Sequence, residues 1–307
     1  MPAARSLSIF NHRAGTLWLA GILLFFSAPF CLADSSLLFK EAQLVLGPEL
    51  GMTMQQTSLG IDYLRRLSGD SGDRGLLAFQ GRLNWNSPEK RLTFDLYNSY
   101  FKLKNPFADW WIGHSRVAYG LNSYFDSHAL LLTPLSMADF GFENAWGTGL
   151  TRDTDWGNVA LSYASNSGLA SGRISYGVLN QNNFNLGISQ AVGSLAGNNE
   201  VNLLGFDAAF LYDNCELRAE RSTGSKGGLS YHSLLVRGGI KLLEEERLKL
   251  EIQRVDLEQG PTYDQTSSLG LSYLFDENLT FRLMAQNDTM SNDTRLVFQT
   301  YYYAPWQ

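Results

Sequence analysis

The sequence predicts an all-β fold, namely a transmembrane antiparallel β-barrel of sixteen strands with one long loop folded into its lumen. Apolar and polar residues alternate through most of the chain, as in half-buried strands. No apolar run after residue 33 approaches the length of about 18 residues that indicates a membrane-spanning helix. One connection, 118–143, is long and rich in Leu, Phe, Tyr and Met, so we expect it to be folded and functional.

The first 33 residues have the features of a secretory signal peptide. Two arginines precede an apolar run over residues 17–30, and small residues occupy both cleavage-specifying positions before residue 34. The apolar run is shorter than the roughly 20 residues that a spanning helix needs. We therefore expect cleavage after Ala33 and a barrel domain over residues 34–307.

The composition restricts the function classes. The signal peptide contains two basic and no acidic residues, so its removal changes the formal net charge from −6 to −8. An acidic chain argues against nucleic acid as a partner. Cys215 is the one cysteine expected to remain, which excludes disulfide frameworks and cysteine metal sites. The many aromatic and glycine residues of an exported, cysteine-poor chain are typical of outer-membrane barrels.

Alternation and turn signals together predict the individual strands. The first is the least regular, because Gly47 and Pro48 interrupt it. Without paired strands in 39–67, fourteen would remain. The sixteen predicted strands are 39–47, 56–67, 75–86, 91–103, 109–117, 144–153, 156–165, 172–180, 183–192, 200–212, 215–223, 229–243, 246–257, 265–275, 278–287 and 294–303.

The links between these strands predict which end of the barrel faces outward. From residue 153 onward, tight links (154–155, 181–182, 213–214, 244–245, 276–277) alternate with longer ones (166–171, 193–199, 224–228, 258–264, 288–293). Short periplasmic turns and longer outer loops are typical of outer-membrane barrels, so the 118–143 loop is expected on the outer side. Aromatic residues near strand ends predict interfacial girdles: Trp85, Trp110, Trp111, Trp146, Trp156, Tyr302 and Trp306.

Two stretches of the chain resemble bacterial outer-membrane porins, at the level of the porin superfamily and with porin O/P-type channels as the model. In Leu96 to His128 a strand carries Gly113, Arg116 and Tyr119 before Gly-Leu, and Pro134 to Leu150 resembles the strand that returns. The resemblance implies a water-filled channel for passive or weakly selective diffusion of small hydrophilic solutes. It also implies residence among the outer-membrane lipids of a Gram-negative bacterium. The sequence gives no oligomeric state, and the homotrimer is an analogy with general porins.

The sequence departs from the porin pattern in two places. Porins typically end in Phe, whereas here the aromatic Trp306 stands one residue before the end. Porin O/P-type channels concentrate Lys in the pore, whereas Lys is sparse in this acidic chain. Phosphate specificity is therefore not carried over from the resemblance.

The predicted site consists of charged residues that face the lumen. On strand 109–117 and just after it, we expect Trp111, Val117 and Tyr119 to face lipid, which leaves His114 and Arg116 inward. Acids of the long loop would then face basic residues of the wall, and such opposed charges select ions. The predicted pore-lining residues are Arg82, Asp95, His114, Arg116, Asp126, Asp139, Glu143, Arg218, Arg237 and Arg282.

Two other functions remain as alternatives. A lipid-modifying barrel enzyme would need a nucleophile and a base, but His114-Ser115 and His232-Ser233 are adjacent pairs, which point to opposite faces of a strand. No Gly-x-Ser-x-Gly elbow and no metal-ligand spacing of His occurs, so no catalytic residue, metal or cofactor is predicted. The other alternative is a structural or partner-bound barrel within a larger complex.

Overall fold

The structure is a computed structural model that describes residues 36–47, 56–69, 72–86, 90–122, 131–178, 182–195, 199–289 and 293–306. The predicted signal peptide lies outside the described residues. No helix among the described residues is long and apolar enough to cross a membrane. The elements are β1 (Ser36–Leu46), β2 (Ser58–Gly69), β3 (Gly72–Asn86), β4 (Arg91–Leu103), β5 (Asp109–Arg116), α2 (Leu135–Phe140), β6 (Asn144–Thr154), β7 (Gly157–Ala164), β8 (Leu169–Tyr176), β9 (Asn183–Leu195), β10 (Asn199–Tyr212), β11 (Cys215–Lys226), β12 (Leu229–Leu242), η3 (Glu244–Glu246), β13 (Leu248–Gln259), β14 (Thr262–Leu274), β15 (Leu279–Asp288) and β16 (Asp293–Pro305).

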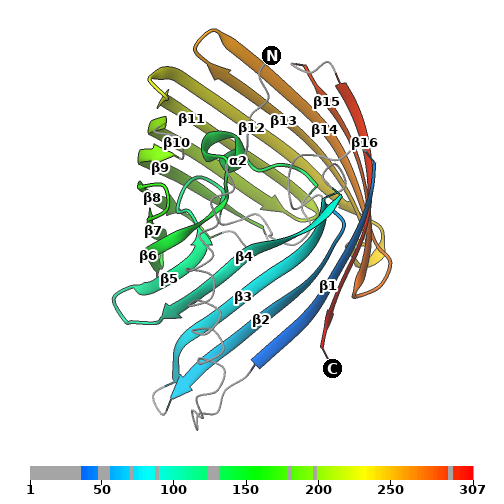
Figure 1. The fold of residues 1–307 in the computed structure, drawn as a ribbon, viewed down its shortest axis with the longest axis horizontal. Helices are drawn as coiled ribbons and strands as arrows, with labels where there is room; N and C mark the ends of the chain where they lie inside the picture. The colour runs from blue at the N-terminus through cyan, green and yellow to red at the C-terminus, as the bar shows by residue number, and fades with distance from the viewer. Residues whose placement is uncertain are drawn as a thin grey trace. The chain divides into compact units, whose positions relative to one another are not determined.

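The strands form one closed antiparallel barrel. Each strand pairs with its neighbours along the chain, and β16 returns to pair with β1 (Figure 1). In the closing pair, Phe39 lies opposite Pro305 and Leu46 lies opposite Phe298. Because β1 also pairs with β2, the sixteen-strand prediction is confirmed and the fourteen-strand alternative is excluded. A closed barrel leaves no unpaired sheet edge, which is what a lipid environment requires of a β structure.

Alternate residues of each strand face opposite sides of the wall. On β10, Leu204 and Phe206 are exposed on the outer face, whereas Leu203 and Asp207 are buried on the inner face. The outer face of the barrel is therefore largely apolar, and the inner face carries the polar and charged residues. This division matches a barrel with lipid outside and a polar lumen.

The predicted aromatic girdles are largely found on the outer face. Six of the seven predicted residues are exposed there or at a strand end: Trp85, Trp110, Trp146, Trp156, Tyr302 and Trp306. Trp111 is the exception, because its side chain lies inside the barrel. Amphipathic rings at strand ends suit the boundary between lipid and water.

The inner and outer faces of β5 are reversed relative to the prediction. The side chain of Trp111 is only 7% exposed, whereas that of Trp110 is 41% exposed. His114 lies opposite Trp146 on β6, whose side chain is 39% exposed, so His114 shares the outer face. The Trp111 indole fits inside because its partner is Gly149, where a Cβ would lie 2.5 Å from the indole Nε1. The predictions that His114 faces the lumen and Trp111 faces lipid are wrong.

The links are not sorted by length as predicted. Two-residue turns occur at both ends of the barrel, at 213–214 at one end and at 227–228 and 260–261 at the other. The links predicted at 224–228 and 258–264 are shorter in the structure, because β11 continues to Lys226 and β14 already begins at Thr262. The end that carries the β5–β6 connection is called the loop end below. Because strand direction alternates, the β11–β12 and β13–β14 turns also lie at the loop end.

Candidate functional site: a loop fastened inside the barrel

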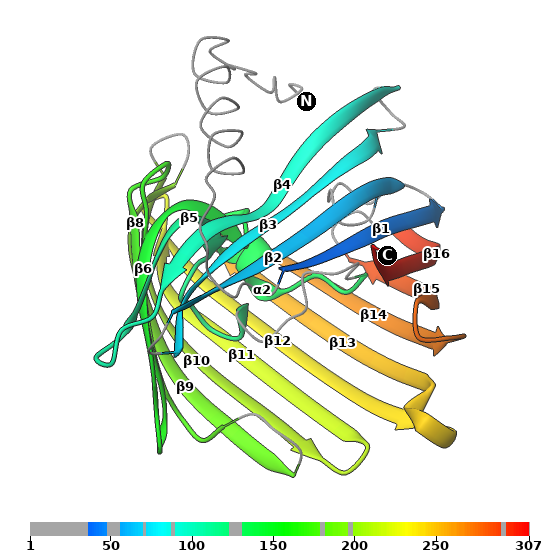
Figure 2. The ribbon, with the colours of Figure 1, turned by 90° about the horizontal axis from the view of Figure 1, so that it is seen from below.

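The β5–β6 connection lies inside the barrel. Figure 1 and Figure 2 both show α2 within the ring of strands. Val117, Tyr119 and Leu121 at the start of this loop are almost fully buried, as are Leu135 and Phe140 in α2. The inward fold of the loop is therefore confirmed for its described residues. The expectation that Val117 and Tyr119 face lipid is wrong.

Hydrogen bonds tie the two arms of the loop together at its base. The backbone N–H of Val117 donates to the carbonyl of Glu143 at 3.1 Å, and Asn122 Nδ2 donates to the same carbonyl at 2.9 Å. The guanidinium of Arg116 donates to the backbone carbonyl of Asn122. Arg116, which was predicted to line the pore, thus holds the first turn of the loop.

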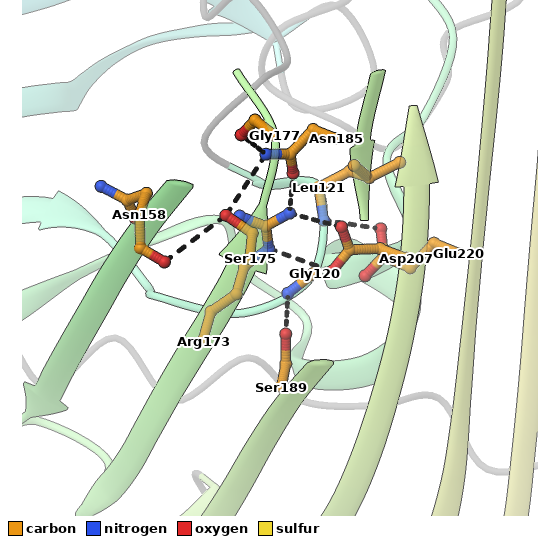
Figure 3. Close-up of polar contacts among 10 residues, drawn as sticks. All are labelled: Gly120, Leu121, Asn158, Arg173, Ser175, Gly177, Asn185, Ser189, Asp207 and Glu220. Carbon is orange, nitrogen blue, oxygen red and sulfur yellow. Dashed lines mark hydrogen bonds and ion pairs between the residues drawn. The ribbon is translucent and has the colours of Figure 1, made fainter. Parts of the chain in front are cut away.

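The first turn of the loop docks on the inner wall (Figure 3). The N–H of Gly120 donates to Ser189 Oγ on β9 at 2.9 Å, and the N–H of Leu121 donates to Glu220 Oε2 on β11 at 3.1 Å. Gly120 has a φ of +52°, a left-handed conformation that favours glycine. A Cβ at this position would also lie 1.7 Å from Glu220 Oε1. A larger residue would require the turn or the buried side chain of Glu220 to move.

A buried ion pair lies beside this turn (Figure 3). Arg173 on β8 donates from Nε to Asp207 Oδ2 at 3.0 Å and from NH2 to Asp207 Oδ1 at 2.5 Å. The same NH2 donates to Asn185 Oδ1 at 2.6 Å. Sequence reasoning missed Arg173 and Asp207, although both occupy inward-facing positions in strands that alternate cleanly. Two parallel bonds fix this geometry more firmly than a single contact would.

The second fastening point is Asp139, at the end of α2. Its carboxylate is fully buried and accepts hydrogen bonds from Ser222 Oγ at 2.7 Å, Ser233 Oγ at 2.8 Å and Tyr231 Oη at 2.9 Å. Burial raises the pKa of Asp139, and the hydroxyl donors oppose that rise. Nearby, Tyr119 Oη donates to Ser222 Oγ at 3.0 Å. The loop acid thus binds hydroxyl groups of the wall rather than the basic residues that were expected.

Glu143 is a buried acid near two cations. Its side chain is 4% exposed, and its carboxylate oxygens have no hydrogen-bond partner among the described residues. Burial raises its pKa, while the charges of Arg116 and Arg237 lower it. This arrangement partly matches the predicted opposition of acidic loop and basic wall residues.

Apolar side chains of the loop contact three parts of the wall. Leu131 and Leu132 pack against Met284 and Val297 on β15 and β16, three and four strands from β12, which α2 contacts. The described parts of the loop therefore contact the inner wall from β7 round to β16. In a second cluster, Leu121 and Leu135 pack against Ala209, Leu235 and Val255 of the wall. In a third, Val117, Tyr119 and Phe140 of the loop pack against wall residues Ala164, Leu169, Ala191, Leu195, Val201, Leu203 and Tyr231.

Three of the residues predicted to line the pore lie on strands β3, β4 and β15. Arg82 is fully buried, forms an ion pair with Glu41 and lies over the ring of Tyr97 at 4.3 Å. Asp95 accepts a hydrogen bond from the amide of Asn84. Arg282 NH1 donates to Gln299 Oε1 at 3.0 Å, and its guanidinium lies 4.9 Å from the ring centre of Tyr301. These are inward-facing side chains held by residues of neighbouring strands, and the Arg82–Glu41 pair spans β2 from β3 to β1.

Arg218 and Arg237 lie on the wall where the loop is fastened. Arg218 Nε forms an ion pair with Glu216 at 2.5 Å. Arg237 donates from Nε to Gln253 Oε1 at 2.7 Å and from NH2 to the carbonyl of Leu132 at 3.2 Å. The structure thus brings Arg237 to the loop. Asp126 lies outside the described residues.

Comparisons with known proteins show the same architecture. No protein-family model matches the sequence, and no curated protein matches it. Among solved structures, OmpF of Salmonella typhi in complex with daunomycin matches with a TM-score of 0.65 at 12% identity, over 88% of this chain and 97% of that one. The chain has the fold of the bacterial porins. A loop L8 deletion mutant of the Vibrio cholerae outer membrane protein OmpT matches with a TM-score of 0.63 at 11% identity, over 88% of this chain and 99% of that one.

A further solved structure is described as an anion-selective porin. This protein of Comamonas acidovorans matches with a TM-score of 0.60 at 13% identity, over 89% of this chain and 100% of that one. The resemblance to the porin superfamily that the sequence suggested is confirmed at the level of the fold. At these identities, fold similarity does not specify a solute.

Proposed function

We propose that this protein is an outer-membrane porin, a water-filled channel for passive or weakly selective diffusion of small hydrophilic solutes. The observation that carries the proposal is a loop fastened to the inner wall of a barrel whose outer face is apolar. A structural barrel has no need to fasten a loop inside its lumen through buried polar bonds. A channel gains from such a loop, because a narrow passage sorts solutes by size and charge.

The proposal extends to the setting of the protein. Export through cleavage after Ala33, residence in the outer membrane of a Gram-negative bacterium and contact with its lipids are all part of it. The apolar outer face and the aromatic residues at the strand ends support this placement. Assembly as a homotrimer is part of the proposal, supported by analogy with a Vibrio cholerae outer membrane protein whose structure is described as a trimer form. The acidic chain supports solutes rather than nucleic acid as its cargo.

Recording single-channel currents of the purified protein in planar lipid bilayers tests the proposal. We expect stepwise currents that scale with salt concentration, since an aqueous pore conducts dissolved ions. A preparation that inserts into the bilayer as a closed barrel but never conducts would overturn the porin proposal. The closed state of the barrel is checked by its faster migration in unheated than in heated detergent gels.

We assign no catalytic activity to the barrel. His232 Nδ1 lies 2.9 Å from Thr223 Oγ1, and its Nε2 lies 3.4 Å from Ser230 Oγ, a hydroxyl rather than the carboxylate that orients the base of a catalytic triad. Among the described residues, no group of three or more His, Cys, Asp or Glu side chains is placed to hold a metal ion. A lipase and acyltransferase assay on the detergent-solubilised protein tests this assignment, and turnover above that of His232→Ala would contradict it.

A further inference from the structure

A half-open cavity of about 190 Å³ lies at the loop end of the barrel, beside α2. The ends of four strands, β11 to β14, form its wall, and Ala138 of α2 closes one side. A solute that enters from the loop end meets this cavity beside the loop. Its principal lining residues are Ala138, Lys226, Tyr231, Leu257, Gln259 and Asp264.

Asp264 brings an unmatched hydrogen-bond acceptor to the cavity. Its Oδ1 is buried and has no hydrogen-bond partner among the described residues. No ion pair within the described part of the chain involves its carboxylate, and Lys226 on the same cavity wall contacts other groups. A buried carboxylate oxygen without a donor is unfavourable. The group that best satisfies it is a cationic N–H donor, such as an ammonium.

Lys226 brings a positive charge to the same cavity. Its Nζ donates to the carbonyl of Ala138 at 2.7 Å and lies 5.1 Å from the ring centre of Tyr231. An ammonium carries three N–H donors. The bond to Ala138 uses one of them, which leaves donors for a carboxylate that enters the cavity.

The remaining wall limits the size and character of the occupant. Leu257 and the ring of Tyr231 give the same cavity apolar surface. Gln259 contributes little free polarity, because its Nε2 already donates to the carbonyl of Lys226 at 3.1 Å. The volume equals roughly six waters at about 30 Å³ each, which is the size of a small organic solute.

We propose that this cavity is a docking subsite for a small zwitterion of amino-acid size, with its ammonium on Asp264 and its carboxylate on Lys226. The inference rests on the proposed function, since it names the solute class that the channel would bind on entry. A single ion would satisfy one charged residue only, and a neutral solute would leave the buried Oδ1 of Asp264 without a cationic donor.

Ligand-observed saturation-transfer NMR with alanine tests the subsite on the full protein in detergent micelles. We expect saturation transfer to the alanine methyl group that falls at least tenfold in Asp264→Asn and in Lys226→Met. The matched control is Asp256→Asn, because Asp256 pairs with Arg254 at 3.0 Å and does not line the cavity. This control should bind alanine as the wild type does. Lys226→Arg keeps the charge and separates loss of the cation from loosening of the loop.

Analogues with one charge test the role of each residue. Propionate lacks the ammonium and ethylammonium lacks the carboxylate, so each should displace alanine only at about tenfold or higher concentration, the effect of losing one charge-assisted bond. No saturation transfer to alanine, or equal transfer in Asp264→Asn, would overturn the subsite. Equal competition by ethylammonium would overturn the assignment of Lys226. These readouts do not require conductance, so a channel that conducts without binding alanine overturns the subsite alone, and an absence of current overturns the porin proposal alone.

Discussion

Gly120→Ala should release the loop from the wall. The left-handed backbone at Gly120 costs a residue with a Cβ about 1–2 kcal/mol. The Cβ would also lie 1.7 Å from Glu220 Oε1, and because Glu220 is itself only 2% exposed, we expect the turn to move and lose its bonds to Glu220 and Ser189. Each bond lost from a buried group costs about 1–3 kcal/mol. The total is roughly 3–8 kcal/mol, against about 1–2 kcal/mol for Gly141→Ala, which has the same sign of φ but open space around it.

The rate of thiol labelling at Ser136→Cys, in a Cys215→Ser background, measures the release, because Ser136 in α2 is only 2% exposed while the loop is docked. When docking is fast, the rate follows the population of the undocked loop. Because 1.4 kcal/mol corresponds to a factor of ten, Gly120→Ala should raise the rate by about 100-fold or more. The increase in labelling rate for Gly141→Ala should be at least tenfold smaller than that for Gly120→Ala. Equal rates in the two variants would refute the close approach at Gly120, since only the shared backbone strain would then matter.

Three further predictions concern other parts of the molecule. Burial raises the pKa of Asp139 in the docked loop, so docking should strengthen as pH falls from neutral toward 4 and weaken as pH rises again. In thiolate-corrected labelling, Asp139→Asn should show a weaker dependence, and an equal slope would contradict this. Glu41→Gln leaves the buried guanidinium of Arg82 without its ion-pair partner and should destabilise the barrel by about 3–5 kcal/mol in guanidinium unfolding; an unchanged midpoint would contradict the pair. Brominated lipids should quench Trp110 but not Trp111, in variants that retain each alone. Equal quenching would contradict the assigned faces of β5.

The strands could be predicted from the sequence because each depends on local information. Alternation at period two and turn residues lie within one hairpin, so the predicted 91–103 coincides with β4 and most other bounds differ by a few residues. The face of β5 could not be predicted in this way. Two adjacent tryptophans carry no alternation, and Gly149 on the next strand decides which of them fits inside.

The fastening of the loop could not be predicted from the sequence either. Asp139 binds Ser222, Tyr231 and Ser233, which are 83 to 94 residues away in the chain. The sequence pattern of serine and tyrosine at inward-facing strand positions is the same whether their hydroxyl groups contact water or a loop. Arg82 and Arg237, which alternation placed on the lumen side, are buried in the structure. Their partners come from other strands and only the fold identifies them.

The lengths of the links between strands were predicted wrongly for a physical reason. Polar residues near the loop end of β11 to β14 resemble loop residues, but their backbones continue the ladder of hydrogen bonds. Side chains beyond the apolar band need not be apolar, because a strand that extends past the lipid faces water. Hydrophobicity alone therefore ended the predicted strands too early.

The most direct test of the central claim is the unit conductance of the wild-type barrel and of a variant that lacks residues 121–138. We propose that the barrel is a water-filled channel that the fastened loop narrows. We therefore expect discrete current steps for the wild type and larger steps for the variant, with both proteins migrating as closed barrels in unheated gels. Steps of equal size would contradict the narrowing, and an absence of steps in both proteins would contradict the channel itself.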